Sequence, residues 1–420
     1  MTGALRSLGW RLASLFCVGF VTLAVLTAPS VVSVGKTAAP RAEAIPGDYF
    51  GMTINRPLTT PWPDFTTKTL RAWDLDIAWT DINPARGKFQ WERFDAIVDL
   101  VHSKGADLVY TFGRTPRWAS AEPDAETDYG PGQCGEPKRI EDWDALVRAV
   151  VERAAGRIKY WEIWNEPQDP KFYCGGVDKL VAMQKRAYAI IKIADPSLQV
   201  LTPAPVGAHG PPWMARFLRA GGGDYADIMA FHGYWDDDPH SVVEAIRRFK
   251  QVFEAGGQRG KPLWNTEGGW GQQLKEAAFD SEWQVAFIAK YYLLQWSEGV
   301  DRTYWYADDN ELGWGTLWDK RDGLRPAGRA YAQVLQWMAG AIMTKPCALQ
   351  DAESGLWTCT LSRANGYSAL VAWRASEPLP FAVPEPFTRV RDLDGRERAT
   401  AGRPIELGAR PMLFESNPIL

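Results

Sequence analysis

Short apolar runs alternate with amphipathic stretches between residues 45 and 340, and this alternation is the strongest constraint on the fold. The stretch Trp91–Lys104 shows the pattern clearly, because apolar residues recur at i, i+3, i+4 and i+7 from Phe94. Such a stretch is typical of a surface helix with one buried face. Strands that alternate with helices in this way form a mostly parallel sheet covered by helices.

Eight strands and five helices are expected over these 290 or so residues. A set of this size predicts a (β/α)8 TIM barrel, which typically has about 250 residues. A doubly wound open sheet is the alternative, but the first strand is not followed by a Gly-rich phosphate loop. The expected strands are Tyr49–Ile54, Arg71–Trp79, Asp107–Phe112, Ile158–Trp164, Gln199–Thr202, Asp227–His232, Pro262–Thr266 and Arg302–Tyr306. The expected helices are Trp91–Lys104, Trp143–Ala154, Val177–Ile193, Ser241–Phe253 and Trp283–Trp296.

The pattern changes near residue 341 to alternating strands joined by turns. Asn365-Gly366 is typical of a hairpin turn, and strands are expected on both sides of it. We therefore divide the chain into a catalytic barrel at 45–340 and a small accessory β-sandwich at 341–420. The expected strands of the sandwich are Leu356–Ser362, Tyr367–Arg374, Thr388–Leu393 and Met412–Glu415.

Residues 1–44 have the features of an export signal. An apolar run, Leu12–Ala28, follows Arg6 and Arg11 and precedes a small-residue stretch that ends at Ala44. Cleavage would leave Ile45 at the amino terminus, and an uncleaved membrane anchor is the alternative. Both place the remaining chain outside the cytoplasm, because the positive flank stays inside: periplasmic, secreted, or anchored and facing outward.

Four cysteines remain after Cys17, which lies in the leader, and an even number suits the oxidising side of a membrane. Of the three pairings we expect the local one, Cys134 with Cys174 and Cys347 with Cys359. A zinc site is the competing interpretation, but the sequence has no C-x-x-C motif and its four histidines are scattered.

Composition narrows the class of ligand. The formal net charge is −4, from 47 Lys and Arg against 51 Asp and Glu, so the chain lacks the basic excess of a nucleic-acid binder. It contains 21 Trp, whose flat faces suit sugar rings as well as a protein core. Carbohydrate is therefore the favoured partner, and a Trp-rich core is the alternative explanation.

Two glutamates stand at the ends of expected strands four and seven. Glu166 lies in Trp164-Asn165-Glu166-Pro167 and Glu267 in Thr266-Glu267-Gly268-Gly269, so each is followed by a residue that ends a strand. Reactive groups of TIM-barrel enzymes stand at the carboxy ends of strands. Two carboxylates converging there are the requirement for cleaving a glycosidic bond, with one acid to protonate the leaving oxygen and a second group to attack or to activate water.

These motifs resemble the clan A retaining (β/α)8 glycoside hydrolases, and most closely glycoside hydrolase family 39 and bacterial exopolysaccharide endoglycosidases. The resemblance covers about residues 48–340 and extends to the appended β-sandwich. It implies hydrolysis of β-glycosidic bonds in a polysaccharide by double displacement. The polysaccharide is expected to be cleaved at internal bonds, and bacterial exopolysaccharide is the preferred substrate class. It implies neither a metal ion nor an organic cofactor, and we expect a monomer.

The resemblance also implies roles for individual residues. Glu166 resembles the acid/base, Glu267 the nucleophile and Asn165 the residue that hydrogen-bonds the sugar 2-hydroxyl. Arg71 resembles the strand-two arginine that supports the nucleophile, and His232 the strand-six residue that lines the reacting subsite. The remaining expected substrate-binding residues are Tyr234 near His232, the strand-eight aromatic floor Trp305 and Tyr306, and the cleft-wall residues Trp118 and Trp270. Asp308-Asp309-Asn310 is more acidic than the resemblance leads us to expect, which bears on the distant subsites.

Several alternatives stay open. Glu166 and Glu267 could be structural carboxylates, and His232 a core histidine; Glu162, one pleat deeper than Glu166, is expected to form an ion pair inside the barrel. The loops 113–139 and 207–223 could form an open groove for endo attack or close a pocket for an exo-β-xylosidase. The alternative from another class is a non-catalytic carbohydrate-binding protein of the cell envelope.

Overall fold

The computed structural model describes residues 40–65, 67–235, 240–270, 282–310, 313–364, 366–375, 377–400 and 402–416. These residues belong to one compact unit, Lys36–Leu420. The expected apolar leader run and Cys17 lie outside the described residues. None of the helices described has the combination of length and apolar character that crossing a bilayer requires.

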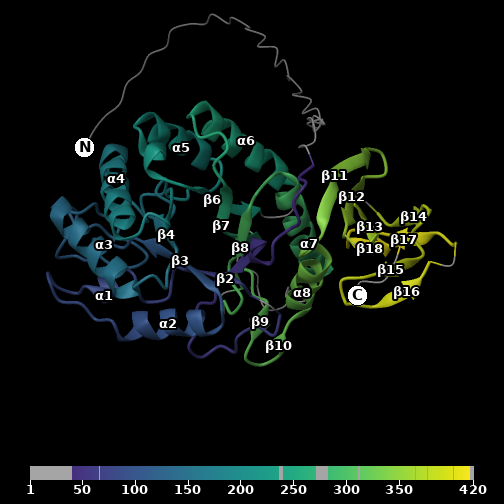
Figure 1. Ribbon diagram of the computed structural model, residues 1–420, viewed down its shortest axis with the longest axis horizontal. Coiled ribbons are helices and arrows are strands. Elements are labelled where there is room, and N and C mark those ends of the chain that lie inside the picture. Colours follow the sequence, from purple (N-terminus) through teal and green to yellow (C-terminus); the bar gives the residue numbers. More distant parts are fainter. Residues whose placement is uncertain are drawn as a thin grey trace, which may run out of the picture. The chain divides into compact units, whose positions relative to one another are not determined.

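Eight parallel strands form one sheet in the order β5-β4-β3-β2-β1-β8-β7-β6 (Figure 1). Parallel bridges between Leu201 and Ile228 and between Val206 and His232 join its two ends, so the sheet closes into a ring. This confirms the predicted (β/α)8 barrel. The strands are β1 (Phe50–Met52), β2 (Thr69–Ala72), β3 (Asp107–Phe112), β4 (Tyr160–Ile163), β5 (Gln199–Leu201), β6 (Met229–Trp235), β7 (Leu263–Trp270) and β8 (Arg302–Trp305).

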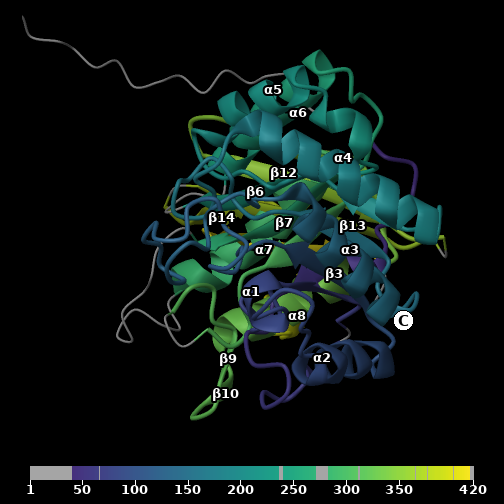
Figure 2. The same cartoon turned by 90° about the vertical axis from the view of Figure 1, so that its left-hand side faces the viewer.

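Helices cover the outside of the strands, and α3 lies beside α4 (Figures 1 and 2). All five expected helices are present within a few residues of the predicted ends. The helices are α1 (Trp79–Ile82), α2 (Glu92–Ser103), α3 (Ile140–Ala154), α4 (Val177–Ala194), α5 (Gly210–Arg219), α6 (Ser241–Ala255), α7 (Glu282–Ser297) and α8 (Pro326–Met338), with 3-10 turns η1 (Gly47–Tyr49) and η2 (Gly222–Tyr225).

Three parts of the barrel differ from the prediction. Expected strand two was too long, because the chain turns at Asp74 and Asp76, which have positive φ, and α1 begins at Trp79. Expected strand seven was too short, because pairing with β6 continues through Gly268 and Gly269 to Trp270. The expected loop 207–223 mostly forms α5 and η2; its prolines lie in the first turn of α5, where the missing N–H groups need no partner.

The C-terminal residues form antiparallel sheets, as the prediction of a β-sandwich requires. One sheet has six strands in the order β11-β12-β13-β18-β15-β16, and the other pairs β14 with β17. Phe381 and Phe414 pack between the two sheets, in a cluster with Leu407. The strands of these sheets are β11 (Ile342–Asp351), β12 (Leu356–Ser362), β13 (Ser368–Arg374), β14 (Leu379–Phe381), β15 (Arg389–Arg391), β16 (Glu397–Ala399), β17 (Ile405–Leu407) and β18 (Met412–Glu415). A separate hairpin, β9 (Trp318–Asp319) and β10 (Gly323–Leu324), lies before α8.

The six-stranded sheet packs directly on the barrel. Cys347 N–H donates a hydrogen bond of 2.8 Å to Ser297 Oγ at the end of α7, and Trp373 donates one of 2.9 Å to His240. Buried side chains of β12 and β13 also belong to the same hydrophobic cluster as the barrel core. The boundary between two domains at residue 341 stays a prediction, since both parts lie in one compact unit.

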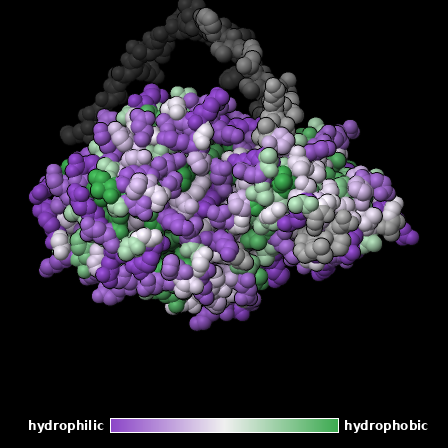
Figure 3. Space-filling model, viewed as in Figure 1, coloured by the Kyte–Doolittle hydropathy of each residue, from purple (hydrophilic) through white to green (hydrophobic). Residues whose placement is uncertain are grey.

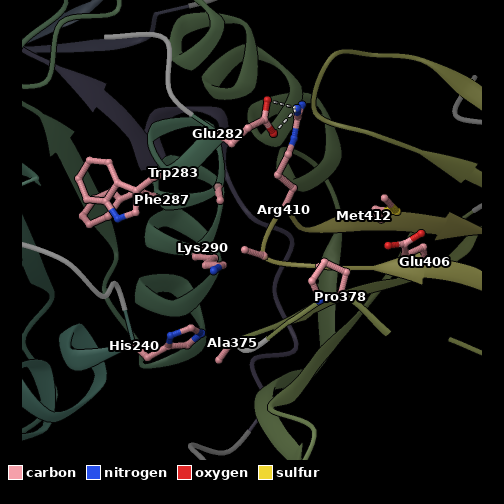
Figure 4. A pocket seen from close by; sticks show the side chains of 13 residues that line it. His240, Glu282, Trp283, Phe287, Lys290, Ala375, Pro378, Glu406, Arg410 and Met412 are labelled. Carbon is pink, nitrogen blue, oxygen red and sulfur yellow. Dashed lines mark hydrogen bonds and ion pairs between the residues drawn. The ribbon is translucent and has the colours of Figure 1, made fainter. Parts of the chain in front are cut away.

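A pocket of about 800 Å³ lies between α7 and the C-terminal strands, and it contains neither Glu166 nor Glu267 (Figure 4). Its wall includes Trp283 and Phe287 and the ion pair of Glu282 with Arg410, whose closest atoms lie 2.9 Å apart. On the molecular face in Figure 3, hydrophobic residues lie scattered among hydrophilic ones.

The expected leader ends next to the barrel. The backbone of Ile45 exchanges hydrogen bonds of 2.8 Å with Gly340 and Ala341, and its side chain is fully buried. Arg41, inside the expected leader, forms an ion pair of 2.9 Å with Asp301 and lies over the ring of Trp296. Cleavage after Ala44 stays a prediction.

Both expected disulfides are confirmed, Cys134–Cys174 and Cys347–Cys359, with sequence separations of 40 and 12 residues. Replacing Cys347 and Cys359 by Ala should lower the free energy of unfolding by about 3 kcal/mol, because the bridge restricts the unfolded chain. The Cys134 and Cys174 pair closes a longer loop and should cost about 4 kcal/mol. Denaturant unfolding of the two double variants measures both values, and curves that superimpose on that of the parent protein would contradict the prediction.

Candidate active site

Arg71, on β2, joins polar side chains from three elements at the carboxy end of the barrel. Its Nε donates to Glu162 Oε2 at 2.7 Å, its Nη1 to Glu267 Oε2 at 2.5 Å and its Nη2 to Asn165 Oδ1 at 2.8 Å. Thr111, on β3, donates a further hydrogen bond of 2.7 Å to Glu162. The side chains of Arg71 and Glu162 are completely buried.

This cluster confirms the predicted barrel-interior ion pair of Glu162 and places Arg71 against Glu267. A guanidinium suits the position because its fork of donors serves several acceptors at once. Removal of one partner from a buried ion pair typically costs about 3–5 kcal/mol, because the other charge stays buried. The cluster therefore fixes where the carboxylate of Glu267 lies.

A β-bulge in β7 aims Glu267 into the ring. Phe231 pairs with Asn265 but His232 pairs with Glu267, so Thr266 is an extra residue in the ladder. Gly268 allows the close approach of β6, since a Cβ there would lie 2.2 Å from the carbonyl oxygen of Gly233. Glu267 consequently lies within β7, and not on a turn after it as predicted.

The conformation of the chain after β4 is unusual and sets the position of Glu166. Trp164 has φ of 81° and Glu166 has φ of 43°, a region that few residues other than glycine adopt. The Glu166 N–H donates a hydrogen bond of 3.1 Å to the Ala204 carbonyl oxygen, which holds this turn against the end of β5. Strained backbone of this kind concentrates at functional sites.

Two side chains of β6 bind the two glutamates. His232 Nδ1 shares a hydrogen bond of 2.8 Å with Glu166 Oε1 and lies 4.0 Å from Glu267 Oε1. Tyr234 Oη donates a hydrogen bond of 2.7 Å to Glu267 Oε1. One carboxylate oxygen of Glu166, one of Glu267 and a nitrogen of His232 all lie within 4.8 Å of one another.

That spacing matters because carboxyl groups about 5–5.5 Å apart suit direct nucleophilic attack, whereas groups about 6.5–9.5 Å apart leave room for a water molecule.

Among the described residues, Glu166, His232 and Glu267 are also the group whose side-chain atoms lie close enough together to hold a metal ion. The guanidinium of Arg71 and the phenol of Tyr234 already bind the oxygens of Glu267, and the positive charge of Arg71 opposes a cation there.

The two glutamates have different electrostatic environments. Burial raises the pKa of Glu166 well above its usual value, and the nearby charge of Glu267 raises it further. Burial raises the pKa of Glu267 as well, and although Arg71 and the hydrogen bond from Tyr234 oppose this rise, the resulting pKa is about 7. Burial and the charge of Arg71 hold the pKa of His232 well below its usual value, so this imidazole is neutral near pH 7.

The structure separates the expected aromatic residues into two groups. Trp270 and Trp305 are fully buried and pack against each other, with ring centroids 5.0 Å apart, so neither presents a face to the cleft. Trp118 packs on Trp79 and donates to the Asn83 carbonyl oxygen, so its contacts are with α1. The structure thus uses the large flat faces of Trp270 and Trp305 in the core, and the expected roles in the cleft wall and aromatic floor stay predictions. Tyr306 is half-buried and lies near Glu267, which together with Glu166 forms what we call the acidic pair.

Three residues at the site were missed. Tyr306 Oη donates a hydrogen bond of 3.0 Å to Asp74, and Tyr129 also binds Asp74. Half-buried Trp314 packs on Tyr234, with ring centroids 5.9 Å apart. The sequence signal for Asp74 was its place three residues after Arg71, but the expected strand Arg71–Trp79 put it inside a strand, whereas β2 ends at Ala72. Tyr129 and Trp314 lie in long connections and had no such signal.

In the acidic run Asp308-Asp309-Asn310 after β8, Asp309 has a structural role. Asp309 accepts hydrogen bonds from the backbone N–H groups of Asn55 and Arg56 and from the Thr60 hydroxyl, so it fixes the connection after β1. Asp308 is only 1% exposed, and burial together with Asp309 raises its pKa to about 8. Neither carboxylate therefore extends into open solvent.

Solved structures that match this fold include glycoside hydrolases. A family 39 glycoside hydrolase from Bacteroides cellulosilyticus has a TM-score of 0.66 and 22% identity, over 88% of this chain and 81% of that one. A family 39 β-xylosidase from Caulobacter crescentus has a TM-score of 0.65 and 19% identity, over 92% and 98%. A family 30 xylanase C from Talaromyces cellulolyticus has a TM-score of 0.59 and 14% identity, over 90% and 96%. At these identities the likeness shows the fold.

The comparison with curated proteins gave no match. The sequence profile of the glycosyl hydrolase catalytic core matches residues 91–331, which is more than half of the chain and runs from the start of α2 into α8. The matched segment includes Glu166, His232 and Glu267. This chain therefore belongs to the glycosyl hydrolase catalytic core family and is a glycoside hydrolase.

Proposed function

We propose that this glycoside hydrolase retains the configuration of the anomeric carbon, with Glu267 as nucleophile and Glu166 as acid/base. The observation that carries the proposal is the separation of the two carboxylates, whose oxygens lie within 4.8 Å of each other. This is too close for an attacking water molecule between Glu267 and the sugar.

Glu267 suits the nucleophile because it must be ionised before the reaction begins. Arg71 and Tyr234 donate one hydrogen bond to each of its oxygens and favour the charged form. Glu166 suits the acid because burial and the charge of Glu267 keep its proton bound. Neutral His232 then orients Glu166 through the hydrogen bond at Nδ1 without competing as a charge.

In the first step a Glu267 oxygen forms a bond to the anomeric carbon while the glycosidic C–O bond breaks. Glu166 gives its proton to the departing oxygen, so the leaving sugar is released as a neutral alcohol. In the second step Glu166, now ionised, takes a proton from water, and the oxygen of that water displaces Glu267 from the anomeric carbon. Both glutamates return to their starting states.

For the substrate we propose a β-linked polysaccharide cleaved at internal bonds, with bacterial exopolysaccharide as the preferred class. Half-buried aromatic rings from three connections support binding of several sugar units: Tyr129 after β3, Phe172 after β4 and Trp314 after β8. Tyr129 and Phe172 lie with ring centroids 5.8 Å apart, and their loops are joined by the disulfide Cys134–Cys174. Structural disulfides form in oxidising compartments, which supports export of the chain.

An exo-β-xylosidase is the alternative within the same chemistry. The Caulobacter crescentus neighbour is described as a β-xylosidase, and the Talaromyces cellulolyticus neighbour as a xylanase. One fold thus serves both kinds of enzyme, and the loops round the mouth of the barrel decide between them.

The variants Glu267→Gln and Glu166→Gln should test the mechanism on the polysaccharide or aryl β-glycoside that the parent protein hydrolyses. Glu267→Gln should abolish turnover, because no nucleophile remains, and Glu166→Gln should lower kcat by about 10²- to 10⁴-fold. Glu141→Gln, at an exposed position on α3, is the matched control and should leave turnover unchanged. Parent-like turnover in both active-site variants would refute the mechanism.

The raised pKa of Glu166 predicts an effect on stability that needs no substrate. Below pH 4 the carboxyl is protonated in both the folded and the unfolded chain; above it the unfolded chain releases the proton, while burial opposes its release in the folded chain. The parent protein should lose stability as the pH rises through this window, and Glu166→Gln should lose less, because Glu267 and Asp308 still have raised pKa values in that variant. The measurement is thermal unfolding at pH 4 and at pH 8. The Tm of the control Glu141→Gln should differ from the Tm of the parent protein by the same amount at both pH values. For Glu166→Gln the Tm should exceed that of the parent at pH 8 but not at pH 4, and parallel curves would contradict the shift.

Product sizes over time separate endo from exo cleavage. If the groove accepts several sugar units, early digests of a β-linked polysaccharide should contain fragments of mixed length and little monosaccharide. Size-exclusion chromatography of samples taken before a tenth of the bonds are cut measures this. Release of monosaccharide alone from the first time point would favour the exo-β-xylosidase.

A further inference from the structure

Asp74 lies two residues beyond β2 and its side chain is half-buried. Its φ is 58°, in the left-handed region that aspartate tolerates better than most residues. Tyr306, which follows β8, donates a hydrogen bond of 3.0 Å to Asp74 Oδ2, and Tyr129, from the connection after β3, also hydrogen-bonds the carboxylate. Two phenols from distant segments thus fix this carboxylate in one orientation.

The carboxylate of Asp74 lies close to the reacting groups. Its charge raises the pKa of both Glu166 and Glu267. Both phenols that bind it also respond to Glu267, whose charge raises the pKa of Tyr129 and of Tyr306. The geometry agrees, because Asp74 follows Arg71, which binds Glu267, by three residues, and the Tyr306 N–H donates a hydrogen bond of 2.9 Å to the carbonyl oxygen of Gly268, next to Glu267. Asp74 therefore lies at the same end of the barrel as the nucleophile.

The cations near Asp74 are already paired. Arg71 and Arg114 are the two arginines whose charges lower the pKa of Asp74. Arg71 binds Glu162, Glu267 and Asn165 as described above. Arg114 donates a hydrogen bond of 2.9 Å to Gln133, lies 3.6 Å from Asp81 and stacks on the Tyr129 ring. Among the residues that the structure describes, a ligand carboxylate placed here would meet the charges of Asp74 and Glu267, while both of these arginines are already bound to other groups.

We propose that Asp74 is a specificity-determining residue, which accepts hydrogen bonds from hydroxyl groups of the sugar bound over Glu267 and rejects sugars that carry a carboxylate. The inference rests on the proposed function and assigns its substrate class as neutral glycans, not polyuronates. A carboxylate is a strong acceptor for hydroxyl donors, because charge-assisted hydrogen bonds exceed neutral ones. Like charges at close range oppose binding of a uronate.

The test compares matched aryl glycosides that differ only at C6, para-nitrophenyl β-glucoside and β-glucuronide, together with a β-linked neutral oligosaccharide and its uronate counterpart. The variants are Asp74→Asn, which keeps the size and one acceptor, and Asp74→Ala. Asp76→Asn is the matched control, since Asp76 shares the turn and a φ of 55° but is exposed and pairs with Arg93.

The parent protein should hydrolyse the neutral member of each pair at least about 100-fold faster than the uronate. Asp74→Ala should lower kcat/KM on the neutral substrate by about 10- to 100-fold, the loss expected for a hydrogen bond to a charged group. Asp74→Asn should reduce the neutral-to-uronate ratio by about 10-fold. A merely structural role would lower both rates together and leave the ratio unchanged. Asp76→Asn should match the parent in both measurements.

Three outcomes overturn the inference: preference of the parent protein for uronates, an unchanged ratio in Asp74→Asn, or parent-like kcat/KM in Asp74→Ala. Failure of the underlying mechanism gives a different result, since Glu267→Gln would then retain turnover. If Asp74→Ala does not fold, as judged by thermal unfolding, the isosteric Asp74→Asn decides through its ratio.

Discussion

The buried guanidinium of Arg71 is the interaction on which both the barrel interior and the acidic pair depend. It compensates Glu162, which has no exposed surface, and at the same time binds Glu267 from the opposite side of the ring. Without it two carboxylates would be buried side by side, which costs several kcal/mol. Its position also creates the difference between the glutamates, because it binds Glu267 directly and reaches Glu166 only through its charge.

The acidic pair is built by departures from regular structure at the carboxy ends of the strands. The bulge at Thr266 turns Glu267 inward, and the left-handed backbone of Trp164 and Glu166 brings the second carboxylate towards it. Each departure removes ladder hydrogen bonds or strains the backbone, and rigid surroundings must hold it. The ring of parallel strands supplies this rigidity beneath the site, and the disulfide Cys134–Cys174 supplies it in the connections above.

Much of the fold could be predicted because local pattern determines it. β3 and β12 have the predicted bounds, since each is an apolar run between polar residues. The errors arose at residues whose type is compatible with two different local structures. Glycine after Glu267 usually ends a strand, but here it permits a close approach to β6. Motifs pointed to the residues that meet at the site, whereas Asp74 and Tyr306 meet across 232 positions, which no local pattern reveals.

The Trp content shows why composition predicts a ligand class less well than motifs do. Twelve of the 21 Trp side chains are buried, Trp270 and Trp305 included, so most of that signal came from the core. Rings that remain half-buried near the glutamates, such as Trp314, provide flat apolar surface that suits many sugars equally. Discrimination between sugars must then come from polar groups held in fixed orientations. A carboxylate held by two phenols beside the nucleophile meets that requirement, and a stacking ring does not.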